Sequence, residues 1–161
     1  MKNLTLENIA KACGGIYVGG EEMKDREVQG IVTDSRKAEP GFLFVPIKGA
    51  RVDAHDFIDS VMANGALCTL TEKDIGKKSF PYIKVHSSLQ AVKDIAEFYL
   101  KQLDIPVVGI TGSVGKTSTK EMIAAVLEQK YKVLKTKGNF NNELGVPLTV
   151  FGLRPEHEIA V

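Results

Sequence analysis

The spacing of apolar residues along this chain alternates between the period of a helix and that of a strand. The first helical face is formed by Leu6, Ile9, Ala10 and Cys13. Gly14 and Gly15 end this predicted helix. Two short strand-like runs follow, "EVQGIVTDSR" and "GFLFVPIKG", with the turn residues Pro40 and Gly41 between them. The beginning of the chain is therefore expected to form a small β-rich module.

The middle of the chain continues this alternation. A second helical face is formed by Phe57, Ile58, Val61 and Met62, and "ALCTL" and "PYIKV" are typical of strands. Ser87 and Gln90 have the spacing of a capping box, which predicts the start of another helix. The apolar side of that helix is formed by Leu89, Val92, Ile95, Ala96 and Tyr99. Alternating helices and strands predict an α/β fold.

The pattern of residue types changes after "KQLDIP", so a domain boundary is expected near Leu103 to Pro106. The apolar run "VVGIT" suits a strand buried on both faces of a parallel sheet. After it come a predicted helix "KTSTKEMIAAVLEQK", a strand "YKVLKT", a helical or turn segment "NNELGVPLTVFGL" and the beginning of a strand, "EIAV". We therefore expect one α/β domain over residues 1–104 and the beginning of a parallel-sheet domain over residues 105–161.

Charge and composition narrow the choice of partners. The 161 residues carry 21 Lys and Arg against 20 Asp and Glu, a net charge of +1, so no global field favours nucleic acid or a membrane surface. The start "MKNLTLENIAKACGG" has the pattern of neither a signal peptide nor a membrane span, and a cytoplasmic protein is expected. Cys13 and Cys68 lie in apolar patterns and are interpreted as buried reduced thiols.

The segment "GITGSVGKTSTKEM" gives the clearest indication of a binding site in this sequence. Gly112 and Gly115 allow a tight turn whose N–H groups point at an anion, and the helix that begins near Lys116 adds its positive end. This short phosphate loop, Gly-x-x-Gly-Lys-Thr, has Ile110 where the longer form has glycine. Lys116 would reach the outer phosphates of ATP, and the Thr117 hydroxyl would hold Mg²⁺. The predicted nucleotide-binding residues are Gly112, Ser113, Val114, Gly115, Lys116, Thr117 and Ser118.

This segment has two other interpretations. A surface turn with an incidental lysine is disfavoured because an apolar strand precedes the loop and a helix follows it. A Rossmann site fits less well because no Gly-x-Gly-x-x-Gly opens the helix.

The phosphate loop and the later "TKGNFNNELGVPLTV" closely resemble the central ATPase domain of the bacterial Mur ligases. The first module agrees, since "TDSRKAEPGFLFVPIKGARVDAHDFID" is similar to the uridine-nucleotide-binding domain of that family. "KEM" after the loop and "GNFNNELGVPLT" favour members that ligate D-alanyl-D-alanine over MurE-type ligases. Val114 stands where many relatives have asparagine, a side chain that the phosphate cradle does not need.

The resemblance implies an ATP-dependent ligation in peptidoglycan synthesis. The terminal carboxylate of UDP-N-acetylmuramoyl-tripeptide would become an acyl phosphate, which the amine of D-alanyl-D-alanine then attacks. Lys116 and Thr117 would be the catalytic residues, because they offset the charge on the phosphoryl oxygens. The substrate-binding residues implied by the resemblance are Asp34, Ser35, Arg36, Lys48, Gly49, Asn139, Asn141 and Asn142.

Several of these assignments have simpler alternatives. Arg36 could be a solvated charge, and the asparagines could form a plain turn. His55 either shapes its loop by hydrogen bonds or contacts ligand, and no catalytic role is expected for it.

The acidic residue that helps to hold magnesium in P-loop enzymes is expected directly after a strand such as "EIAV", where this sequence stops at Val161. Glutamates at 121, 128, 156 and 158 are not placed to substitute for it. We therefore expect the N-terminal portion of a longer ligase, inactive in isolation. The alternatives are a stand-alone nucleotide or UDP-sugar-binding module, a MurE-type ligase and, less favoured, a generic P-loop kinase or GTPase.

Overall fold

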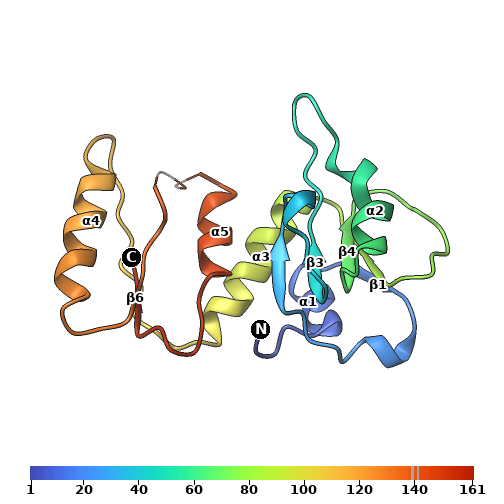
Figure 1. Cartoon of the computed structure of the whole chain (residues 1–161), viewed down its shortest axis with the longest axis horizontal. Coiled ribbons are helices and arrows are strands. Elements are labelled where there is room, and N and C mark those ends of the chain that lie inside the picture. The colour runs from blue at the N-terminus through green and yellow to red at the C-terminus, as the bar shows by residue number, and fades with distance from the viewer. Residues whose placement is uncertain (139, 141) are drawn as a thin grey trace. The chain divides into compact units, whose positions relative to one another are not determined.

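The computed structural model describes residues 1–138, 140 and 142–161 (Figure 1). The chain forms two compact units, Met1–Ile95 and Ala96–Val161, and each is described by itself. The division between the units falls within helix α3 (Ser88–Lys101), nine residues before the division after residue 104 that the sequence suggests.

The first unit is built on a five-stranded sheet with the order β1-β5-β4-β3-β2. Its strands are β1 (Ile16–Val18), β2 (Gly30–Val32), β3 (Phe42–Phe44), β4 (Cys68–Thr71) and β5 (Tyr82–Lys84). Strands β2 to β5 are mutually parallel where they pair, and β1 runs antiparallel to β5. The predicted α/β class is confirmed.

The helical elements of this unit precede, separate and follow the strands in the chain, and the last helix continues into the second unit. The α-helices are α1 (Leu6–Ala12), α2 (Ile58–Ala63) and α3 (Ser88–Lys101), and the 3₁₀ turns are η1 (Glu21–Met23), η2 (Ser35–Lys37) and η3 (Ala54–Phe57). Thr5 caps α1 by accepting the N–H of Asn8. Ser87 accepts the N–H of Gln90 at the start of α3, as the capping-box spacing predicted, whereas the Gln90 side chain bonds Asp94 instead.

The core of the first unit is centred on β4, the middle strand of the sheet, and its neighbour β3. Leu43 and Phe44 of β3 and all of β4 are buried. Helix α2 packs on this sheet through Ile58 and Val61, which cluster with Phe44 and Ala66. Phe57 was expected on the same face, but its side chain is 40% exposed. Phe57 is the last residue of η3, and the different number of residues per turn in a 3₁₀ helix places its side chain away from the buried face of α2.

The second unit contains α4 (Lys116–Leu127), β6 (Val133–Leu134), α5 (Gly145–Val150) and β7 (Ile159–Ala160). Strands β6 and β7 are parallel, and Val107 forms a single parallel bridge with Ala160. Figure 1 shows α4 and α5 on opposite sides of β6. The Tyr99 hydroxyl, on the part of α3 that belongs to this unit, donates to the Leu153 carbonyl and is buried.

The expectation that "VVGIT" is a strand buried on both faces is wrong for this structure. Val107 is 52% exposed, and its one described bridge is the one to Ala160. Within the described residues, this apolar run pairs beside Ala160 of β7 and then leads into the phosphate loop.

Two further features follow from the described residues. Within the described ranges no helix combines the length and apolar character needed to cross a bilayer. Cys68 is fully buried, which raises the pKa of its thiol, and Cys13 is only partly buried, so the expectation of two buried thiols holds for one of them.

Candidate functional site

The phosphate loop is shaped by two glycines in conformations that other residues rarely adopt. Gly112 has φ 144° and Gly115 has φ 81°. Gly115 is the N-cap of α4 and makes no side-chain cap, so the first N–H groups of the helix are left for other partners. This geometry is a helix N-terminus that can accept an anion.

Lys116 folds back over this loop. Its ammonium donates to the Gly112 carbonyl across 2.5 Å, and the side chain is partly buried. Thr117 is exposed, as are Ser113 and Ser118. Val114, at the tip, is 91% exposed, so its side chain contributes little to the loop's packing. The structure thus brings together the predicted nucleotide-binding residues.

A cavity of about 460 Å³ opens beside the loop. Its polar lining includes Gly112, Lys116, Thr117 and Lys120, and the rest is largely apolar, with Leu134, Phe140 and Val150 among the lining residues. None of the described lining residues is acidic. Lys116, the nearby positive charge of Lys120 and a helix N-terminus with no described side-chain cap make this cavity suited to an anionic ligand.

The same cavity offers few ligands for a metal ion. Thr117 is its one residue in the predicted magnesium role. Across residues 1–138, 140 and 142–161 there is no group of three or more His, Cys, Asp or Glu side chains arranged to hold a metal. The protein atoms described here would therefore hold Mg²⁺ through Thr117, with phosphate oxygens supplying further ligands.

Lys120 is a site residue that sequence reasoning missed. It is 6% exposed and donates to the carbonyls of Thr136 (2.5 Å) and Gly138 (2.9 Å). Its ammonium also lies 3.1 Å from Glu121 Oε1. The available signal was the lysine's place one turn after Lys116, on the same helix face.

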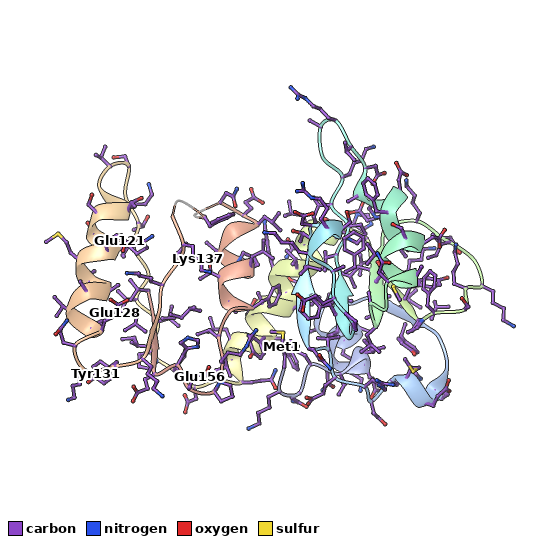
Figure 2. All side chains as sticks on the ribbon, in the orientation of Figure 1. Met1, Glu121, Glu128, Tyr131, Lys137 and Glu156 are labelled. Carbon is purple, nitrogen blue, oxygen red and sulfur yellow. The ribbon has the colours of Figure 1, made fainter. Side chains whose placement is uncertain are left out.

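The glutamates of α4 are used in ion pairs. Glu121 and Glu128 lie along α4 in Figure 2, and Lys135 contacts both, at 3.0 Å and 3.4 Å. The bond to Lys135, followed by that to Lys120, lowers the pKa of the Glu121 carboxyl. Neither glutamate is among the residues that line the cavity, as the sequence suggested.

The predicted asparagine cluster is only partly described. Asn139 and Asn141 lie outside the described residues. Asn142 uses its side-chain oxygen to accept the N–H groups of Leu144 (3.3 Å) and Gly145 (2.6 Å), so it caps the start of α5. In the described structure Asn142 therefore has a local structural role.

In the first unit, Asp34 and Arg36 form one compact turn after β2. Asp34 accepts the Arg36 N–H, and its two oxygens accept from Arg36 Nε (2.9 Å) and Nη2 (2.8 Å). These bonds to Arg36 lower the pKa of the Asp34 carboxyl to about 2. The Arg36 side chain is still 86% exposed, so it presents a positive charge to solvent beside Ser35.

Lys48 and Gly49 lie in the loop after β3. Lys48 forms an antiparallel bridge with Asp53, and the Gly49 N–H donates to the Val52 carbonyl. His55, which is buried, has Nδ1 2.6 Å from Asp53 Oδ1, and its Nε2 accepts the Glu72 N–H. His55 therefore shapes this loop by hydrogen bonds, which was one of its two predicted roles.

These two loops lie at the same edge of the sheet. Strands β2 and β3 are parallel neighbours, so the segments that follow their carboxyl ends emerge together. Open α/β sheets bind ligands at this edge. The edge places Arg36 and Lys48 as candidate contacts for an anionic ligand of the first unit.

Two models of known protein families match this chain over the residues that form these loops. The catalytic domain of the Mur ligase family matches residues 27–133, and the Mur ligase middle domain matches residues 110–161. The chain belongs to the Mur ligase family. Both the sheet-edge loops of the first unit and the phosphate loop fall within the matched residues.

Two of the curated relatives that this chain resembles carry the same name. The UDP-N-acetylmuramoyl-tripeptide–D-alanyl-D-alanine ligase of Bacillus subtilis is 40% identical over 159 residues, which cover 98% of this chain and 35% of the relative. The ligase of the same name from Escherichia coli is 40% identical over 161 residues, covering 100% and 34%. The chain thus spans about a third of the length of these relatives, and it is similar to their N-terminal portion.

Solved structures show the same relationship. A MurF crystal structure from Acinetobacter baumannii has a TM-score of 0.87 at 36% identity, over 98% of this chain and 34% of that one. MurF from Thermotoga maritima, in complex with ADP, has a TM-score of 0.77 at 38% identity, over 86% and 32%. A 2,6-diaminopimelate ligase at 18% identity and TM-score 0.59 shares the fold alone.

Proposed function

We propose that this chain supplies the uridine-binding and ATP-binding parts of a ligase that joins D-alanyl-D-alanine to UDP-N-acetylmuramoyl-tripeptide in peptidoglycan synthesis. The observation that carries the proposal is the phosphate loop at the start of α4, with Lys116 and Thr117 beside a cavity that has no described acidic lining residue. Its similarity to the named ligases supports the choice of reaction. The activity belongs to the complete ligase.

In the second unit, the N–H groups at the start of α4 would bind phosphate oxygens of ATP. Lys116 would leave the Gly112 carbonyl and donate to the outer phosphates, a short movement of a side chain that already lies over the loop. Thr117 would hold Mg²⁺, which supplies charge neutralisation at the phosphates when bound. Lys116 would then stabilise the negative charge on the transferred phosphoryl group.

The need for ATP follows from the acceptor's chemistry. A carboxylate is a poor electrophile, so its oxygen first attacks the γ-phosphorus and ADP leaves. The D-alanyl-D-alanine amine then attacks the carbonyl carbon of the acyl phosphate, phosphate leaves with the C–O bonding pair, and the nitrogen gives up one proton to form the neutral amide. The family resemblance supports this order of reaction steps.

In the first unit, the turn Asp34-Ser35-Arg36 and the loop with Lys48 and Gly49 would bind the UDP moiety. The exposed guanidinium of Arg36 supplies a charge for the diphosphate, and Asp34 fixes its orientation through two hydrogen bonds. We assign Asn139, Asn141 and Asn142 to the substrate side of the phosphate site on the resemblance alone. The cytoplasmic location remains a prediction.

A stand-alone nucleotide-binding module is the second candidate, and ligand titration separates the two. A polypeptide of these residues is titrated calorimetrically with MgATP, with MgGTP and, separately, with UDP-N-acetylmuramoyl-tripeptide. Binding of MgATP and of the uridine nucleotide supports the ligase assignment. Binding of MgATP without any affinity for the uridine nucleotide favours the stand-alone module, and equal affinity for GTP and ATP favours a generic P-loop protein.

A further inference from the structure

Two lysines of α4 line the same cavity but have different surroundings. Lys116 is only partly buried and has one described acceptor, the carbonyl of Gly112 in its own loop. Lys120 is 6% exposed and has three acceptors, the carbonyls of Thr136 and Gly138 and the Glu121 carboxylate. An ammonium has three N–H donors, so those of Lys120 are all used.

Those acceptors connect α4 to the opposite wall of the cavity. Thr136 and Gly138 follow β6, and both line the cavity together with Phe140. The Thr136 N–H also donates to the Val161 carbonyl, which fixes one end of the segment to the chain next to β7. The segment 136–138 is therefore held from the sheet on one side and from the phosphate-binding helix on the other.

The other end of this wall is held by close backbone packing. A Cβ on Gly145, at the start of α5, would lie 2.6 Å from the Phe140 carbonyl oxygen, a distance that real Cβ atoms essentially never show. Asn142 caps the same helix. The wall thus has two independent fixed points, Lys120 at residues 136–138 and Gly145 at residue 140.

From this arrangement we propose that Lys120 is a positioning residue. It clamps the cavity wall 136–138 at a fixed distance from the phosphate loop and does not itself bind phosphate. The inference deepens the proposed function, because this wall would set the acceptor carboxylate against the ATP phosphates that Lys116 holds. A buried cation whose donors are all satisfied by the protein is costly to redirect toward a ligand.

The test compares Lys120→Met with Lys116→Met by backbone hydrogen exchange and by ADP titration in the presence of Mg²⁺. Lys120→Met is expected to raise exchange at Thr136 and its neighbours at least tenfold and to leave ADP affinity within threefold. Lys116→Met is expected to weaken ADP binding and to leave hydrogen exchange at Thr136 unchanged. Lys120→Arg should restore protection, since guanidinium donors can reach both carbonyls. Lys135→Met, which removes another partner of Glu121, is the matched control and should change neither readout.

The complete ligase supplies a further readout that general destabilisation does not give. Lys120→Met should lower kcat at least tenfold with the KM for ATP within threefold. If Lys120→Met proves too unstable, Gly145→Ala is the second variant, because it disturbs the same wall at its other end. It should likewise lower kcat and leave the KM for ATP within threefold.

Loss of ADP affinity in Lys120→Met equal to that in Lys116→Met, with unchanged exchange at Thr136, would make Lys120 a direct ligand and overturn the proposal. Absence of ADP binding by the unmodified chain contradicts the proposed function, whereas the exchange experiment needs no nucleotide and still decides the role of Lys120.

Discussion

The imidazole of His55 is oriented by Asp53, whose Oδ1 lies 2.6 Å from Nδ1 and also accepts the His55 backbone N–H. Because the other ring nitrogen, Nε2, accepts the Glu72 N–H, the proton of the neutral ring is on Nδ1. The second oxygen of Asp53 accepts from Lys73. One carboxylate therefore ties the loop after β3 to the segment that follows β4.

This carboxylate should make the first unit acid-sensitive. The His55 N–H, then Lys73 and the His55 ring, lower the pKa of Asp53 well below its ordinary value of 3.8. A lowered pKa in the folded state contributes stability that is complete above pH 4 and is lost as the pH falls below it. Asp53→Asn should therefore lower the unfolding temperature at pH 7, and the difference from the unmodified chain should shrink toward pH 3.

Thermal unfolding followed by circular dichroism at both pH values measures this difference. Asp25→Asn, which changes an exposed carboxylate, is the control and should give a small shift at either pH. A difference for Asp53→Asn that stays constant from pH 7 to pH 3 would show that the charge of Asp53 does not stabilise the fold.

Arg36 should contribute to uridine nucleotide binding. Arg36→Ala removes an exposed guanidinium already oriented by Asp34, so the affinity for UDP should fall about tenfold or more. Titration calorimetry with UDP measures the change. Lys11→Ala, which removes another exposed ion-paired cation, should leave the affinity unaltered. Equal losses in the two variants would make Arg36 a solvated charge.

Sequence patterns predicted those elements whose signals are local. The helix at 88–101 has a cap, Ser87, and an apolar face that includes Val92 and Ile95, and the structure contains both features. The turn at the phosphate loop was likewise predictable, since glycine is the residue that most readily adopts the positive φ observed at Gly115.

Features that depend on distant partners were not predictable. Strand β1 was not predicted because it buries little apolar surface, with Ile16 66% exposed, and it forms by pairing with β5. The burial of Lys120 depends on carbonyls 16 and 18 residues away in the chain. The sequence alone did not show whether the Asn142 side chain bonds the backbone or a ligand, because asparagine is common in both roles. In the structure it accepts the Gly145 N–H.

The second unit should be the less protected of the two. Strands β6 and β7 have two residues each, and Val107 adds a single bridge, whereas the first unit has a five-stranded sheet with β4 wholly buried. Few buried contacts and short ladders lower the free energy of local opening. Hydrogen exchange should be faster in β6 and β7 than in β3 and β4. Equal protection in both units would contradict this expectation.

A polypeptide limited to these 161 residues should not turn over ATP. Among the described cavity-lining residues, Thr117 has no acidic neighbour to share a magnesium ion. Losing about 7 kcal/mol of transition-state stabilisation slows a reaction roughly 10⁵-fold. Phosphate release with Mg²⁺, ATP, UDP-N-acetylmuramoyl-tripeptide and D-alanyl-D-alanine should match that of Lys116→Ala. Substrate-dependent release that disappears in Lys116→Ala would show a catalytically complete chain.

The central claim is that the loop from Gly112 to Thr117 binds the phosphates of an adenine nucleotide through Lys116. Calorimetric titration with ADP and Mg²⁺ tests it most directly, on the unmodified chain, on Lys116→Met and on Lys130→Met, which removes an exposed lysine beyond the other end of α4. Saturable binding is predicted for the unmodified chain and for Lys130→Met, with affinity at least tenfold weaker in Lys116→Met. Equal affinity in all three proteins, or no binding by the unmodified chain, would contradict the claim.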